Sequence, residues 1–124
     1  MKPITWVVLT LGVLLLAGCS KSPESTVESF YQAIAKGEIT EAQGYVSAQL
    51  VAMLGQGKLS AALSGETGRI RACGGIKSVD VKLQGEGEVR TGTAVVSYGG
   101  KCPTKTENIK LIKEDGKWKI SANK

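Results

Sequence analysis

The sequence predicts an α+β domain in which N-terminal helices pack on a curved four-stranded antiparallel sheet, after a cleaved signal peptide. Two observations support this class. Between residues 22 and 72 apolar residues recur at helical spacing, whereas from residue 74 onward they alternate with a period of two. A run of helices followed by a run of strands is typical of α+β domains. With 124 residues, the chain has room for one such domain.

Residues 1–18 are predicted to be a lipoprotein signal peptide. Lys2 supplies a positive charge, and residues 4–16 form an apolar run that is shorter than the roughly 20 residues of a membrane span. The run ends in Leu16-Ala17-Gly18-Cys19, which resembles the lipobox of bacterial lipoproteins. The resemblance implies removal of residues 1–18, attachment of a diacylglycerol to the Cys19 thiol and acylation of the new amino terminus. Two alternatives stay open: a retained membrane anchor, and ordinary cleavage after Ser20.

The same resemblance predicts where the protein resides. Residues 19–22 would form a short lipidated tether, and residues 23–124 the domain. In Gram-negative lipoproteins the residue after the lipidated cysteine directs sorting, and Ser20, in place of Asp, favours the outer membrane. The expected location is therefore the cell envelope, with the domain facing the periplasm and the membrane as its partner through Cys19.

Three helices are expected. The first has Ser22 as a cap and Pro23 at its first position, and it closes at Lys36-Gly37. The second starts at a capping box formed by Thr40 and Gln43, and Val51, Met53 and Leu54 continue or restart it. The third spans residues 58–72, although Gly65 and Gly68 weaken it. The expected apolar faces are, in chain order, Val27, Phe30, Tyr31 and Ile34; Ala42, Tyr45, Val46 and Leu50; and Leu59, Ala62, Leu63, Glu66 and Ile70.

Four strands are expected to follow as a meander. The first alternates Val79, Val81 and Leu83 with polar residues, and a turn at residues 85–87 leads to a second strand over residues 88–98. Gly92, in the middle of the second strand, suggests a bulge or bend. The third strand is expected to open at Cys102-Pro103, and Asp115-Gly116 predicts a tight turn into the last strand, which carries Trp118 and Ile120 on one side.

The cysteines and the absence of histidine narrow the chemistry. If Cys19 carries lipid, Cys73 and Cys102 remain as a pair in a compartment where disulfides persist. A structural bridge is favoured over a redox pair, because the two lie far apart in sequence, and over a metal site, because two thiolates under-coordinate zinc. A chain without histidine cannot form a Ser-His-Asp or Cys-His site. We expect no catalytic residues, no metal and no cofactor.

Several motifs together resemble one family. The chain begins its domain with Pro23, Val27, Phe30 and Tyr31, passes through Lys36-Gly37-Glu38, Ala42 and Tyr45-Val46-Ser47, and ends with Lys113-Glu114-Asp115-Gly116-Lys117-Trp118-Lys119-Ile120. In these features it is similar to the DUF4878 group of lipoproteins, which is related to the NTF2-like or cystatin-like fold. The resemblance implies a cone-shaped domain whose bent sheet wraps a helix and sometimes leaves a pocket. The group brings no catalytic residues with it, and the His that pockets of NTF2-like enzymes typically hold is absent.

The expected function is that of a non-enzymatic binding or scaffold module. A carrier or sensor of a small hydrophobic ligand is the alternative, and an enzyme built on Glu66 or Asp80 is disfavoured because a solvated Asp80 and a Glu66 at the core rim are the simpler interpretations. The expected pocket residues are Tyr31, Tyr45, Glu66, Tyr98 and Trp118.

The positive net charge bears on which partners the protein could bind. The net charge is +5, and from Lys101 onward seven lysines face three acids, which could meet an anionic surface or an acidic envelope protein or could simply keep the sheet soluble. No nucleic-acid partner is expected. A closed core would favour the scaffold, a cavity of several hundred cubic ångströms the carrier, and a buried carboxylate inside that cavity the enzyme.

Overall fold

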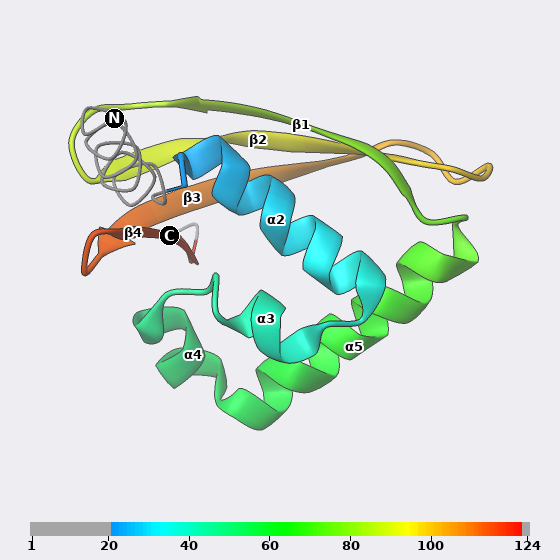
Figure 1. Ribbon diagram of the computed structural model, residues 1–124, viewed down its shortest axis with the longest axis horizontal. Helices are drawn as coiled ribbons and strands as arrows, with labels where there is room; N and C mark the ends of the chain where they lie inside the picture. The colour runs from blue at the N-terminus through cyan, green and yellow to red at the C-terminus, as the bar shows by residue number, and fades with distance from the viewer. Residues whose placement is uncertain (1–20, 123–124) are drawn as a thin grey trace, which may run out of the picture.

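The computed structural model describes residues 21–122, and these form one layer of helices packed on one sheet (Figure 1). The signal peptide and Cys19 lie outside the described residues. The elements are α2 (Pro23–Lys36), α3 (Ile39–Gln43), α4 (Ala48–Leu54), α5 (Gln56–Ala72), β1 (Ile76–Gln84), β2 (Val89–Tyr98), β3 (Lys105–Glu114) and β4 (Lys117–Ser121). This order and layering confirm the predicted α+β class. None of the helices described between residues 21 and 122 is long and apolar enough to span a membrane.

Helix α2 forms where local signals predict it. The Ser22 side chain accepts a hydrogen bond from the backbone N–H of Ser25, and Pro23 occupies the first helical position. Gly37 ends the helix in the left-handed conformation, with φ of 78°, and its N–H bonds to the carbonyls of Ala33 and Ile34. Val27, Tyr31 and Ile34 are buried as expected, whereas Phe30 is only partly buried.

The capping box predicted at Thr40 does not form, since the helix there begins at Ile39. The chain forms two short helices, and no side chain caps α3. Between them Val46 makes a parallel bridge to Ile120 of β4, with the N–H of Ser47 donating to the Ile120 carbonyl at 2.8 Å. The hydroxyl of Ser47 then caps α4 by accepting from the N–H of Leu50. Backbone groups of β4 therefore form the hydrogen bonds that residues 45–47 would otherwise form within a continuous helix.

Helix α5 lies against α2. Its buried residues are Leu59, Leu63, Thr67 and Ile70. The Thr67 hydroxyl donates to the carbonyl of Ile34 at 2.6 Å, which ties the two helices together. Ala62, predicted to face the core, is exposed, and Glu66 is partly exposed, so the buried stripe runs through Thr67 instead.

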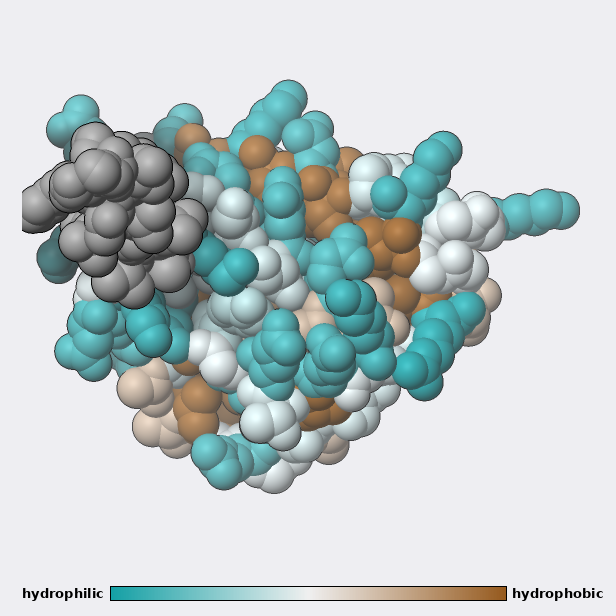
Figure 2. Space-filling model, in the orientation of Figure 1, coloured by the Kyte–Doolittle hydropathy of each residue, from teal (hydrophilic) through white to brown (hydrophobic). Residues whose placement is uncertain are grey.

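Helix α4 is the least covered of the described helices. None of its residues is buried, and Met53 and Leu54 are among the most exposed large hydrophobic side chains of the described part of the chain. Figure 2 shows brown atoms at the lower left of the view, in the region of α4. This helix therefore contributes little burial to the core that holds the domain together.

The sheet is an antiparallel meander in the order β1-β2-β3-β4, as predicted. Asp115 and Gly116 both have positive φ, 51° and 77°, which is the conformation of a two-residue hairpin turn. The third strand begins at Lys105 and not at Cys102, since Pro103 lacks the N–H that a ladder needs. Helix side chains pack on one face of this sheet, and the largest fully buried apolar residues of the core are Val27, Ile34, Ile70, Val96 and Leu111.

Of the bulge or bend predicted at Gly92, the bulge is wrong. Gly92 pairs in register with Leu83 on one side and Ile109 on the other, and the irregularity of β1 lies between Ile76 and Ser78. A Cβ on Gly92 would lie 1.9 Å from the Lys82 carbonyl oxygen. Glycine is needed here because the strand backbones approach closely.

The end of α5 is joined to the β2–β3 connection. The sulfurs of Cys73 and Cys102 lie 2.10 Å apart, with their Cα atoms 5.4 Å apart, so the predicted pair is at disulfide distance. The N–H of Gly100 donates to the Cys73 carbonyl at 2.8 Å, and a Cβ on Gly74 would lie 2.5 Å from the Gly100 nitrogen. This junction lies at the opposite end of the sheet from the start of α2 (Figure 1).

Candidate functional site

A cavity of about 360 Å³ opens between the start of α2 and the edge of the sheet at β4. Its walls come from the segment before α2, from α2 itself, from the α3–α4 connection and from the β3–β4 hairpin. The lining residues are Lys21, Thr26, Gly44, Tyr45, Gly116, Lys117, Trp118 and Lys119. The volume falls in the range typical of small-molecule sites.

The α3–α4 connection builds one wall of this cavity because it attaches to β4. The N–H of Ile120 donates to the Tyr45 carbonyl at 2.8 Å, next to the Val46–Ile120 bridge. The Lys119 ammonium also donates to the carbonyl of Gly44. The broken helix thus brings Tyr45 to the same place as Trp118.

The cavity is positively charged. Three of the eight lining residues are lysines and none is an acid. Outside the lining, the Arg90 guanidinium lies 4.9 Å and the Lys113 ammonium 5.5 Å from the centre of the Trp118 ring. Cations over an aromatic face are held by its quadrupole, so positive charge gathers around this indole. The arrangement suits an anion that also has an apolar part.

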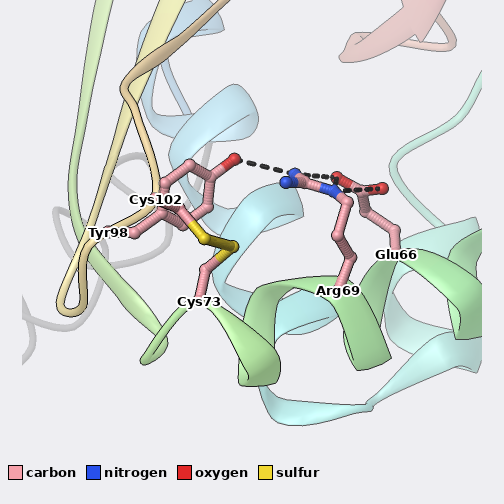
Figure 3. The surroundings of a disulfide bond; sticks show 5 residues. All are labelled: Glu66, Arg69, Cys73, Tyr98 and Cys102. Carbon is pink, nitrogen blue, oxygen red and sulfur yellow. Dashed lines mark hydrogen bonds and ion pairs between the residues drawn. A yellow bond between two sulfur atoms is a disulfide. The ribbon is translucent and has the colours of Figure 1, made fainter.

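A second cluster joins α5 to β2 beside the disulfide (Figure 3). Arg69 Nη2 lies 2.6 Å from Glu66 Oε2 and donates to the Tyr98 hydroxyl at 2.8 Å. The guanidinium also lies 5.2 Å from the centre of the Tyr98 ring. The Arg69 guanidinium thus binds Glu66 on its own helix and Tyr98 on β2. The cluster therefore links the helix to the sheet.

The electrostatics of this cluster disfavour acid–base chemistry. The hydrogen bond from Arg69 holds the pKa of Glu66 below its ordinary value, so Glu66 is a carboxylate at neutral pH. A general acid would need the opposite shift. Burial raises the pKa of Tyr31, and the nearby charges of Glu107 and Glu66 raise it further, so Tyr31 stays a neutral phenol.

The five predicted pocket residues do not form one pocket. Tyr45 and Trp118 line the cavity, whereas Glu66 and Tyr98 belong to the Arg69 cluster. Tyr31 is buried in the core and interacts electrostatically with the cluster. The division arises because Tyr45 follows the broken helix to β4, while Tyr98 lies at the far end of β2.

Some site residues escaped the sequence interpretation. Lys21 and Thr26 come from the start of α2, and nothing in their local pattern points to a cavity. Arg69 could have been found, since it lies three residues after Glu66 on the same helix, the spacing of an ion pair. Asp80 is exposed on β1 and Asp115 lies in the hairpin turn, as the simpler interpretations had it.

The comparisons with known proteins bear on the fold. No family model and no curated protein matches the sequence. Among solved structures, the chain is similar to a protein from Campylobacter jejuni that is provisionally named an NTF2-like transpeptidase, with a TM-score of 0.73 and 15% identity. The match covers 83% of this chain and all of that one. At this identity the likeness shows the fold, which is NTF2-like.

Proposed function

We propose that this chain is a lipid-anchored protein of the bacterial cell envelope, and that its NTF2-like domain is a non-enzymatic binding module. The observation that supports binding is the cavity of about 360 Å³, whose lining combines Tyr45 and Trp118 with three lysines and no carboxylate. The expected ligand is a small molecule with an anionic group for the ammonium groups and an apolar portion for the rings.

This ligand chemistry is favoured over the two alternatives that the sequence left open. A purely scaffolding domain has no need of a cavity of this size. A neutral hydrophobic ligand would cover the lysine side chains without neutralising their charge, which costs free energy. An anion both fills the space and neutralises those charges.

Catalysis is not part of the proposal. The name of the Campylobacter protein suggests group transfer, which requires a nucleophile and a base. Here the chain has no histidine, and the sulfurs of Cys73 and Cys102 lie at bonding distance from each other. None of the eight lining residues in the described part of the chain carries a carboxylate, which is the feature that would favour an enzyme.

The proposed location depends on the sequence before the domain. The lipobox-like Leu16-Ala17-Gly18-Cys19 supports lipidation of Cys19, and Ser20 supports the outer membrane. A cysteine pair at disulfide distance fits an oxidising compartment such as the periplasm. Membership of the DUF4878 group is proposed on the motifs alone.

Phenyl phosphate, an anion attached to one aromatic ring, tests the binding site. We expect it to change the fluorescence of Trp118 saturably in the mature chain from residue 19, prepared with Cys19→Ser to prevent lipidation. Lys117→Gln is expected to weaken the binding about fivefold, because one exposed charge contact contributes about 1 kcal/mol.

Lys101→Gln is the matched control, since Lys101 is also exposed and lies outside the cavity lining, in the β2–β3 connection. It removes the same charge and should leave the affinity unchanged. Equal weakening by both variants would mean that phenyl phosphate responds to net charge alone. That result, or the absence of saturable binding, would reject the cavity as the binding site.

A further inference from the structure

We propose that the cavity lies against the bilayer to which the chain is anchored, and that it takes the headgroup of an anionic phospholipid from that bilayer. The inference rests on the proposed lipid anchor and names the ligand of the proposed site. We call the lining side chains Lys21, Tyr45, Lys117, Trp118 and Lys119 the cavity face.

The short tether would keep the cavity face close to the bilayer. Only Ser20 and Lys21 separate Cys19 from Ser22, the residue that caps α2. Three residue steps span at most about 11 Å even when fully extended. Lys21 itself lines the cavity, so a lipidated Cys19 would hold the opening close to the phospholipid headgroups. A tether this short leaves the domain little freedom to turn this end away from the surface.

One end of the sheet, the end nearest the start of α2, would face the bilayer. The β1–β2 and β3–β4 turns lie at the same end of the sheet as the start of α2 (Figure 1). The N–H of Lys113 donates to the Glu88 carbonyl at 3.0 Å, which joins the two turns. The Cys73–Cys102 junction lies at the other end and would face away from the bilayer.

Charge complementarity selects an anionic headgroup. Lys21, Lys117 and Lys119 all line the cavity, and lysine ammonium groups are attracted to negatively charged lipids. The Lys21 ammonium also donates to the Ser29 hydroxyl, and the Lys119 ammonium to the Gly44 carbonyl. The two acids of the β3–β4 hairpin do not line the cavity: the Glu114 carboxylate accepts from the N–H of Ala48, and Asp115 is in the turn. A headgroup phosphate therefore meets lysines without a competing carboxylate in the lining.

The aromatic residues of the cavity face match the same environment. Trp and Tyr favour the boundary between hydrocarbon and water, where an apolar ring and a polar tip are both accommodated. Trp118 is partly buried, and the cations of Arg90 and Lys113 lie near its ring, so the indole is surrounded by positive charge. The cavity face thus combines headgroup-binding cations with interfacial rings.

Trp118 also provides the test, because it is the only tryptophan that remains once residues 1–18, with Trp6, are removed. Lipidated protein would be reconstituted into phosphatidylcholine vesicles that contain a headgroup nitroxide lipid and increasing fractions of phosphatidylglycerol. We expect quenching of Trp118 that increases with the anionic fraction. Lys117→Gln should raise the fraction needed for half-maximal quenching by about fivefold or abolish the increase.

Lys101→Gln again serves as the control and should behave like the unsubstituted protein. Absence of Trp118 quenching at every lipid composition would overturn the orientation. Quenching that is equal in neutral and anionic vesicles, or equally altered by both variants, would overturn headgroup binding. A protein that carries its acyl chains and binds phenyl phosphate but gives either result would lose this inference and keep the proposed function.

Discussion

Replacing both Cys73 and Cys102 by serine is expected to lower the free energy of unfolding by about 3 to 4 kcal/mol. The bridge closes a loop with a sequence separation of 29, and opening that loop frees the unfolded chain. This loss is large beside the roughly 5 to 15 kcal/mol that stabilises a domain in total. We therefore expect the double variant to be marginally folded at physiological temperature.

The structure around the bridge explains why other contacts would not compensate. Cys73 ends α5, and Cys102 lies in the connection between β2 and β3, so the bridge fixes the helical layer to the sheet. The remaining links at this end are the hydrogen bond from Gly100 to Cys73 and the Arg69–Tyr98 contact. The Arg69 side chain is 39% exposed, so solvent weakens that contact.

Denaturant unfolding of the two proteins measures the difference. Adding reductant to the unsubstituted protein should reproduce the loss, and adding it to the double variant should change nothing. A loss below about 1 kcal/mol, with no response to reductant, would mean that the two sulfurs are not bonded in the folded protein.

Gly92→Ala is expected to destabilise the domain by about 2 to 3 kcal/mol. The added methyl would lie 1.9 Å from the Lys82 carbonyl oxygen and 2.9 Å from the Leu83 Cα. Both are backbone atoms of β1, so relief requires the two strands to separate, and β2 is held on its other side by β3. The sheet cannot make room without losing ladder hydrogen bonds.

Gly65→Ala is the matched control because it adds the same methyl group in α5, where a Cβ would meet nothing within 4 Å. It should stabilise the protein by about 0.5 to 1 kcal/mol, since alanine is the better helix former. Thermal unfolding shows directly whether each variant is more or less stable than the unsubstituted protein. If Gly92→Ala were neutral or stabilising, the close approach of β1 and β2 at this position would be wrong.

Sequence reasoning predicted the elements whose causes are local. Ser22, Pro23 and Gly37 define α2 through their own backbone preferences, and Asp115-Gly116 defines the last turn in the same way. Val27, Tyr31 and Ile34, predicted to share one face of the first helix, are likewise buried.

The errors come from partners far away in sequence. Nothing near Val46 shows that Ile120 will bridge to it, so the position of the break between α3 and α4 could not be predicted. That break places Tyr45 beside Trp118 in the cavity lining, whereas the other three predicted pocket residues, Tyr31, Glu66 and Tyr98, lie elsewhere. Gly92 signalled a special backbone position, but whether it serves a bulge or a close approach depends on the neighbouring strand.

The mass of the mature protein isolated from bacterial membranes tests the central claim most directly. Our account predicts a chain that begins at Cys19 and carries a diacylglycerol and an amino-terminal acyl chain, and a Cys19→Ala variant that leaves the membrane fraction. An unmodified amino terminus, or a Cys19→Ala variant that stays with the membranes, would contradict it.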